Sequence, residues 1–309
     1  MTKLAAYVAI LVVVFAGTVG LGRLAGPMSA AATRQPAHGS TPGAHRPLAD
    51  PPLGDLPRGL QVAQDGYRLQ PLTTSLSVGA PAEFAFRIVG SAGAPVTGYT
   101  PTHERDLHLI VVRRDLSGFQ HVHPSLGADD TWRTTLSVAA PGQYRVFADF
   151  QPASRGEPLT LGVDAPAPGD YTPAPLPAPA RTVTVDGYTV DLAGDLVAGT
   201  ASRLTLQISR GGEPVTDLQP YLGAYGHLVA LRDGDLAYLH VHPDGAPGDG
   251  RTAPGPHVAF HAEVPSAGTY RLYLDFQYAG RVHTAEFTAV AAERGATAQS
   301  TSTGHDQHN

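Results

Sequence analysis

Two copies of the tetrapeptide His-Val-His-Pro place pairs of imidazoles where they can bind a transition metal. The copies begin at His121 and His240, and a further histidine lies upstream of each copy, at His108 and His227. Neutral imidazole is a common ligand of Zn²⁺ and Cu²⁺. The candidate metal ligands therefore form two sets, His108, His121 and His123 in the first and His227, His240 and His242 in the second.

A β-hairpin around Asp233-Gly234 is expected to hold the second set together. Asp-Gly is a favoured two-residue turn between antiparallel strands, and here it separates the apolar runs that contain His227 and His240. With a two-residue turn, His227 faces His240, and directly opposed residues share a face of the sheet. His242 shares that face because it lies two residues further on. The first set has the same spacing, but its turn, RRDLSG, also allows a longer loop and a shifted register.

Further histidines and carboxylates are candidates for additional ligands or for acceptors that orient a ligating histidine. These candidates are His103, Asp149, His257, His261, Asp275 and His283. His257 and His261 share a face, because they lie four residues apart on a predicted strand. The predicted hairpin face is also partly apolar, so the alternative interpretation is that the histidines are structural and bond to the backbone.

The composition restricts the metal and the chemistry. The chain contains no cysteine, and both methionines, Met1 and Met28, precede the predicted globular part. Imidazole and carboxylate ligands without sulfur suit Cu(II), Zn(II) or Ni(II) and argue against Cu(I). The sequence contains no nucleophile elbow, phosphate-binding loop, dinucleotide fingerprint or His-Glu-x-x-His motif. We therefore expect a metal-binding protein that is not an enzyme.

The segments that carry the histidines belong to an internal duplication. DGY occurs at 65–67 and 186–188, PVT at 95–97 and 214–216, and DFQ at 149–151 and 275–277. Alternating apolar and polar residues in EFAFRIV and RLTLQIS predict half-buried strands. Many short strands separated by turn signals are typical of a sandwich. The sequence predicts an all-β fold of two tandem immunoglobulin-like β-sandwich repeats, at 58–164 and 182–292.

The segments outside the repeats predict an exported protein. Residues 4–22 are uncharged and apolar, and they are long enough for a membrane-spanning helix. We expect 1–26 to be a membrane anchor, or alternatively a signal peptide cleaved near SAAA at 29–32. Residues 27–57 are predicted to be a disordered Pro/Ala spacer, 165–181 a Pro-rich linker and 293–309 a disordered tail. The expected location is the cell membrane, single-pass with extracytoplasmic domains, or secreted if the segment is cleaved.

The charge of the chain bears on its partners. The net charge is −6 and only 16% of residues are charged, so no basic face points to nucleic acid. The expected partners are a divalent metal ion, the membrane through the N-terminal helix, and an envelope protein. The leading hypothesis is extracytoplasmic binding or buffering of Cu(II) or Zn(II). The alternative is a non-metal adhesion or assembly module of the cell envelope with structural histidines.

The paired segments HLIVVRRDLSGFQHVHP and GHLVALRDGDLAYLHVHP, after an N-terminal anchor and a Pro/Ala spacer, resemble a family of uncharacterised actinobacterial exported or membrane-anchored proteins. The resemblance covers nearly all of 58–291 and implies export without defining an activity. More distantly, a small extracytoplasmic sandwich with clustered histidines is similar to CopC-type copper-resistance carriers, which is an analogy of fold alone. The chain lacks the Met-rich segment of some of those carriers, which argues against Cu(I) transfer.

Overall fold

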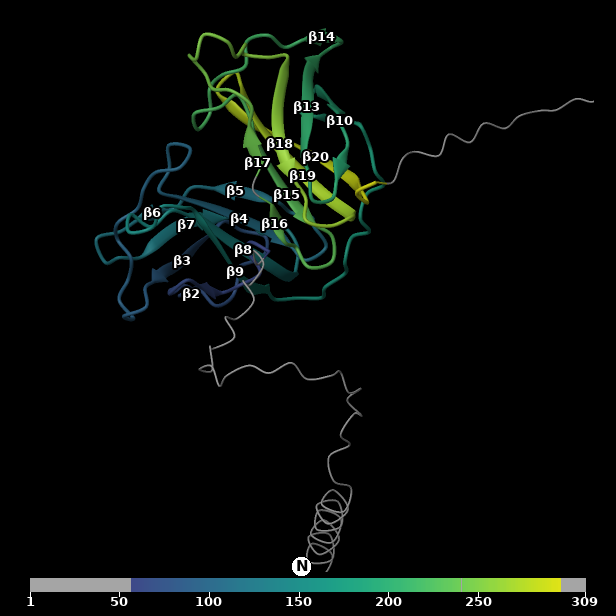
Figure 1. Ribbon diagram of the computed structural model, residues 1–309. Coiled ribbons are helices and arrows are strands. Elements are labelled where there is room, and N and C mark those ends of the chain that lie inside the picture. The colour runs from purple at the N-terminus through teal and green to yellow at the C-terminus, as the bar shows by residue number, and fades with distance from the viewer. Residues whose placement is uncertain (1–56, 240, 296–309) are drawn as a thin grey trace, which may run out of the picture. The chain divides into compact units, whose positions relative to one another are not determined.

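The computed structural model describes residues 57–239 and 241–295, and these residues form strands without any helix (Figure 1). The strands of the first repeat are β1 (Ala63–Gln64), β2 (Tyr67–Pro71), β3 (Ala82–Val89), β4 (Leu107–Arg113), β5 (Gln120–Val122), β6 (Ser125–Leu126), β7 (Trp132–Leu136), β8 (Gly142–Phe150) and β9 (Leu159–Ala167). Those of the second are β10 (Thr182–Val185), β11 (Tyr188–Ala193), β12 (Leu196–Val197), β13 (Ala201–Arg210), β14 (Glu213–Pro214), β15 (His227–Arg232), β16 (Tyr238–Leu239), β17 (Val241–Pro243), β18 (His257–Glu263), β19 (Gly268–Tyr278) and β20 (Arg281–Ala292).

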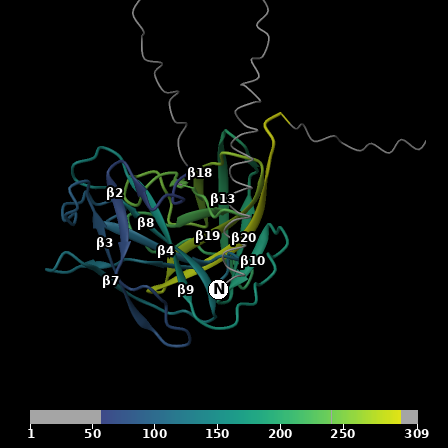
Figure 2. The ribbon, with the colours of Figure 1, turned by 90° about the horizontal axis from the view of Figure 1, so that it is seen from below.

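Each repeat folds into two mainly antiparallel sheets, so the predicted pair of immunoglobulin-like sandwiches is confirmed. The first repeat has sheets in the orders β1-β2-β3-β7-β6 and β5-β4-β8-β9. Figure 2 shows β2, β3 and β7 beside β4, β8 and β9 as these two layers. The second repeat has the orders β10-β11-β13-β18-β17, with β14 on β13, and β12-β20-β19-β15-β16. The strands of the first repeat recur in the same order in the second, which adds β12 and β14.

Alternating side chains close a separate core within each sandwich. In the first repeat, Phe84 and Phe86 of β3 pack with Trp132 of β7. In the second, Leu206 of β13 packs with Phe260 of β18. Burying side chains of this size contributes about 1.5–3 kcal/mol each. Each repeat therefore has its own hydrophobic core.

A third hydrophobic cluster joins the two repeats. It comprises Ile110, Val112, Leu116 and Phe147 of the first repeat and Val229, Leu231, Leu236, Tyr238 and Tyr273 of the second. Phe119 stacks on Tyr273 with ring centroids 3.9 Å apart, and the Tyr273 hydroxyl donates to the Leu116 carbonyl at 2.6 Å. The repeats thus share buried apolar surface in addition to the chain that connects them.

The beginning of the first repeat and the linker between the repeats also make contacts at their junction. The Gly59 amide donates to the Thr160 carbonyl of β9, and the Tyr238 amide donates to the Arg58 carbonyl at 2.9 Å. The predicted linker, 165–181, begins inside β9, and Leu176 packs on the cluster between the repeats. Both segments therefore lie against the repeats where these approach one another.

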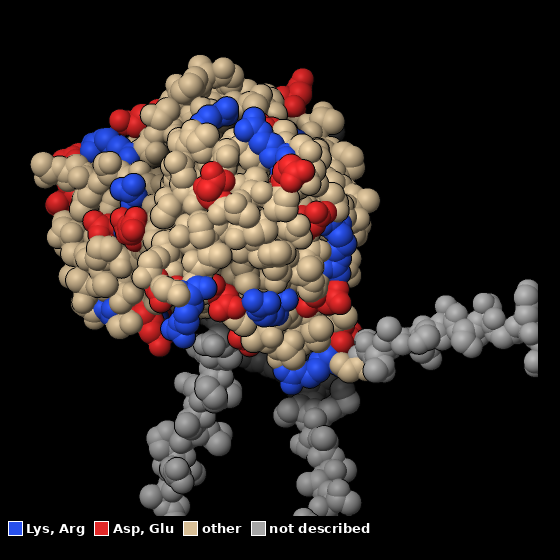
Figure 3. Space-filling view, turned by 90° about the horizontal axis from the view of Figure 1, so that it is seen from above, with Lys and Arg blue, Asp and Glu red and all other residues tan. Residues whose placement is uncertain are grey.

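The predicted anchor (1–26), nearly all of the spacer and residues 296–309 of the tail lie outside the described residues. Within 57–239 and 241–295, no helix has the length and apolar character needed to cross a membrane. On the face shown in Figure 3, basic and acidic side chains are interspersed, and neither sign gathers into a large patch. This pattern gives that face no broad basic surface for a polyanion.

Candidate metal centre

Three histidines of the first repeat converge on one point. The Nδ1 atom of His108 lies 3.1 Å from Nε2 of His121 and 3.2 Å from Nε2 of His123. One ring nitrogen from each histidine lies within 4.8 Å of the others. Around a tetrahedral ion with metal–nitrogen bonds of about 2.0–2.1 Å, ligand nitrogens are about 3.3 Å apart. Two of the three separations are therefore already close to those of a metal centre.

The strand register brings these side chains together. In the pairing of β4 with β5, Ile110 lies opposite His121, which puts both on one face. His108 shares that face because it lies two residues before Ile110. His123 follows the end of β5, where the chain leaves this sheet for β6. The face is turned toward the second repeat, since Ile110 belongs to the cluster between the repeats.

The other ring nitrogens of two of these histidines have acceptors that fix their tautomers. Nε2 of His108 lies 2.9 Å from the Thr102 carbonyl oxygen, which only accepts, so this nitrogen carries the proton. Nδ1 of His121 lies 2.8 Å from a carboxylate oxygen of Asp275, in the second repeat, and donates to it. The side chains of His121 and Asp275 are only 5% and 4% exposed, so water hardly competes for this contact. Acceptors of this kind orient ligating histidines in metal proteins.

This arrangement leaves lone pairs facing one another. In the neutral rings, Nδ1 of His108 and Nε2 of His121 are both unprotonated, yet they lie 3.1 Å apart. If Nε2 of His123 donates its N–H to Nδ1 of His108, Nε2 of His121 still faces Nδ1 of His108 with no proton between them. Either a proton on Nε2 of His121 or a metal ion between the three rings makes the contact favourable.

Burial keeps the imidazoles of His108 and His123 in the neutral, metal-binding form. Desolvation, followed by the neighbouring His121, lowers the pKa of His108 to about 2. The same two causes, with the nearby Arg105 as the next, lower the pKa of His123 to about 3. A metal ion therefore does not have to displace a proton from either ring at neutral pH.

The second repeat supplies an equivalent histidine beside the centre. Nε2 of His227 lies 2.8 Å from the Tyr221 carbonyl oxygen, as His108 lies against Thr102. Burial first, opposed by this bond, lowers the pKa of His227 to about 4. The His103 ring lies between the two, with centroids 5.1 Å from His227 and 6.0 Å from His108. Both repeats thus contribute imidazoles to one region.

A small cavity connects these groups. Its volume is about 40 Å³, and its lining includes His103, His108, His121, Asp149 and His227. Asp149 accepts a hydrogen bond from Thr160, as Asp275 accepts one from Thr284. Burial raises the pKa of the Asp149 carboxyl group. The two candidate aspartates are therefore equivalent in fold, but only Asp275 has a direct bond to one of the three converging histidines.

The predicted hairpin of the second repeat is wrong in its register. Leu231 lies opposite Tyr238, and the Leu236 amide bonds to the Arg232 carbonyl, so the loop is longer than two residues. Asp235 stabilises this loop by accepting from the Arg232 guanidinium and from the Ala237 amide. Leu236 adopts a left-handed φ of 61°. Side-chain bonds within the turn therefore outweigh the Asp-Gly preference.

His242 of the second set does not share a sheet with His227. His240 lies outside the described residues. His242 lies on β17, which pairs with β18 of the other sheet, and it is exposed opposite His261. The chain therefore changes sheets before His242, which removes this residue from the face that carries His227.

The remaining candidates lie elsewhere. His257 and His261 are exposed on β18, and Nε2 of His261 is 3.7 Å from a carboxylate oxygen of Asp244. His283 is buried, with Nδ1 2.7 Å from Asp186 and its ring against Tyr188 and Phe276. Within the described residues, His108, His121 and His123 form the one group with the spacing of a metal site.

Sequence reasoning missed the backbone carbonyls of Thr102 and Tyr221 as acceptors, because any residue can supply a carbonyl. It identified Asp275 as an acceptor but did not assign it to a histidine of the other repeat. The repeated DFQ at 149–151 and 275–277 was the signal for that aspartate.

Comparisons with known proteins identify the repeats. A family model described as "Domain of unknown function (DUF8832)" matches residues 61–171 and 183–293. No curated protein matches the chain.

Similar solved structures include surface layer protein SbsC, domains 4-9 (14% identity, TM-score 0.23, 73% of this chain and 31% of that chain). The Escherichia coli adhesin FdeC is 16% identical, with a TM-score of 0.24 over 74% of this chain and 65% of that chain. The Yersinia pseudotuberculosis adhesin InvE is 14% identical, with a TM-score of 0.21 over 72% of this chain and 58% of that chain. The present chain spans less than two thirds of each of these three chains.

Proposed function

Because the chain belongs to the family described as "Domain of unknown function (DUF8832)", whose description specifies no ligand, we propose its function from the geometry of the site: it binds a divalent transition metal, Cu(II) or Zn(II). The observation that supports this proposal best is the convergence of three ring nitrogens, on His108, His121 and His123. Two of these rings have their other nitrogen bonded to an acceptor, which leaves the converging nitrogen as the ligand atom.

The donor set suits these metals. Three neutral imidazoles without sulfur match Zn(II) or Cu(II), and three protein ligands leave a further coordination position for water or a fourth group. The proposed role is binding or buffering without turnover, because the sequence carries none of the catalytic motifs considered above. With residues 4–22 as a membrane anchor or signal segment, the metal would be bound outside the cytoplasm.

The test is calorimetric titration of the purified full-length chain with Zn²⁺ and with Cu²⁺ at pH 7.5. We expect a dissociation constant below about 1 µM, which corresponds to more than about 8 kcal/mol. The double variant His121→Ala/His123→Ala should lose this binding. His257→Ala is the matched control, because it removes an exposed imidazole that is not part of the converging group. A titration without heat, or an affinity that the double variant retains, would refute the proposal.

A second candidate function follows if a proton, and not a metal ion, lies between the facing nitrogens of His108 and His121. A proton on Nε2 of His121 would donate to His108 while Nδ1 still donates to Asp275. The histidines would then be structural groups that hold the two repeats together, in an adhesion or assembly module of the cell envelope. Absence of metal binding combined with loss of stability in His121→Gln would favour this alternative.

A further inference from the structure

We propose that the cleft between the two repeats is the entrance to the metal centre, and that His261 and His242 are the first ligands an incoming divalent ion meets there. This inference rests on the proposed function, because it needs a metal centre to which the cleft leads.

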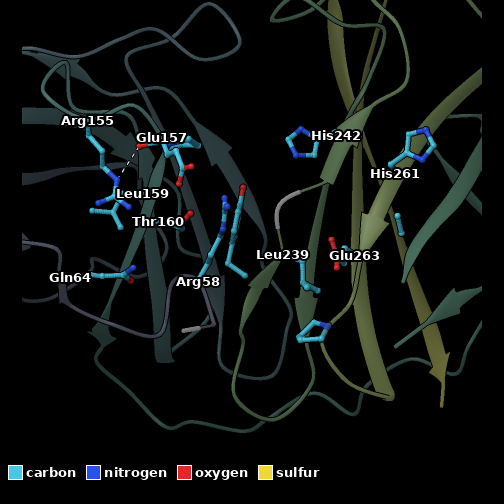
Figure 4. Close-up of a pocket in the computed structure, with 14 residues that line it drawn as sticks. Arg58, Gln64, Arg155, Glu157, Leu159, Thr160, Leu239, His242, His261 and Glu263 are labelled. Carbon is cyan, nitrogen blue, oxygen red and sulfur yellow. Dashed lines mark hydrogen bonds between the residues drawn. The ribbon is translucent and has the colours of Figure 1, made fainter. Parts of the chain in front are cut away.

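The cleft has a volume of about 490 Å³ and is walled by both repeats (Figure 4). The first repeat contributes Arg58, Gln64, Arg155, Glu157 and Thr160, and the second contributes Tyr238, Leu239, His242, His261 and Glu263. Figure 4 shows His242 on the wall formed by the second repeat, with His261 on the neighbouring strand, farther from the first repeat. An ion in the cleft therefore meets imidazole from the second repeat.

His242 and His261 are placed to act as a pair. They are directly opposed residues on the antiparallel strands β17 and β18. Opposed residues share a face, with Cβ atoms about 5 Å apart, which lets two imidazoles reach one ion. The carboxylate of Asp244, two residues beyond His242, lies 3.7 Å from Nε2 of His261. Both histidines are exposed, as a first contact with ions from solvent requires.

The cleft adjoins the small inner cavity beside the centre. Its lining shares Tyr238 with the small inner cavity, and Thr160 of the cleft donates to Asp149 of that cavity at 2.8 Å. His103 lines the inner cavity and lies near His242 of the cleft and His121 of the centre. Its pKa is lowered by burial first, and then by His242 and by His121. Histidines of increasing burial therefore lead from the cleft to the centre.

The charges along the two approaches differ. Glu157 and Glu263 line the cleft and attract cations. The cleft also contains Arg155, which is paired with Asp65 at 2.7 Å, and Arg58, whose charge acts on Asp149. On the side of His123, Arg105 is the nearby charge that opposes protonation of that histidine. The side of His123 therefore carries a cation, Arg105, close to a converging histidine.

The test is the rate of Zn²⁺ transfer from a chromogenic chelator to the full-length chain, followed by stopped-flow absorbance. We expect the loading rate of His261→Ala to fall about five- to tenfold. The dissociation rate should fall by the same factor, which leaves the equilibrium affinity unchanged, because the ion leaves by the path it enters. His242→Ala/His261→Ala should load still more slowly. His257→Ala is the control, since it lies on the same face of β18 but lines a different hollow.

The outcomes separate the two proposals. If the wild-type chain binds Zn²⁺ and His261→Ala loads at the same rate, the entrance is refuted and the metal centre stands. If His261→Ala loses affinity through faster dissociation alone, His261 retains the ion instead of admitting it, and the entrance is again refuted. If the wild-type chain takes up no metal, the proposed function fails and this inference fails with it.

Discussion

His121 occupies the central position in the proposed site, because both of its ring nitrogens are in use. Nδ1 donates to Asp275 of the second repeat, and Nε2 faces Nδ1 of His108. The Asp275 carboxylate fixes the orientation of the ring, which directs Nε2 at His108. His121 therefore connects the proposed site to the second repeat.

The metal-free chain is expected to lose stability as the pH falls below about 6.5. The pKa of His108 is lowered to about 2 and that of His227 to about 4, so both stay neutral in the fold at pH 5. In the unfolded chain the same rings take up protons below about pH 6.5, so acid favours unfolding. The cost is up to about 2 kcal/mol for each buried histidine between pH 6.5 and 5.

Urea unfolding at pH 7.5, 6 and 5 in the presence of a chelator measures this effect. His108→Gln keeps a donor for the Thr102 carbonyl but does not titrate, so its stability should depend less on pH than that of the wild type. Equal pH dependence in the two proteins would show that His108 is not held neutral.

At the scale of elements, β4 is buried on both faces. Leu109 and Val111 point into the core of the first repeat, and Ile110 and Val112 point into the cluster between the repeats. Because both faces are covered by apolar side chains, the run HLIVV does not alternate apolar and polar residues. Its partner in the second repeat, HLVAL on β15, is buried in the same way. A strand with two buried faces positions His108 rigidly at its beginning.

Ile110→Ala is expected to destabilise the chain by about 2–5 kcal/mol, because it removes buried methyl groups and leaves a cavity between the repeats. Val282→Ala is the control, since that side chain is 40% exposed on β20 and its loss should cost less than about 0.5 kcal/mol. Denaturant unfolding measures both. If the two variants were equally stable, the packing of β4 against the second repeat would contribute little.

The sequence predicts these elements unequally well. Alternation in EFAFRIV predicts β3, and the apolar run predicts β4 with both faces covered. The hairpin register could not be read from Asp233-Gly234, because the side chain of Asp235 bonds to Arg232 and Ala237 and stabilises a longer loop. The crossing of His242 to the other sheet depends on the pairing of β17 with β18, which no local pattern specifies.

At the scale of the whole molecule, the duplication predicts two sandwiches but not how they share surface. Periodicity tells which face of β4 carries His108 and Ile110, but it does not tell what covers that face. The structure covers it with the second repeat, so the acceptor of His121 comes from Asp275 and not from the equivalent Asp149. A site built across two repeats is therefore visible only after the chain is folded.

This arrangement predicts that metal binding in the first repeat stabilises the second. Saturating Zn²⁺ at about 100 times the dissociation constant adds about 2.7 kcal/mol to the folded state. Because His121 is bonded to Asp275, hydrogen exchange should slow in β19 as well as in β4 and β5, and mass spectrometry of the matching peptides measures it. In Asp275→Asn at saturating Zn²⁺, slowing should persist in β4 and weaken in β19. Asp186→Asn, which changes only the partner of His283, should keep both effects. Slowing confined to the first repeat of the wild type would mean that the centre does not couple the repeats.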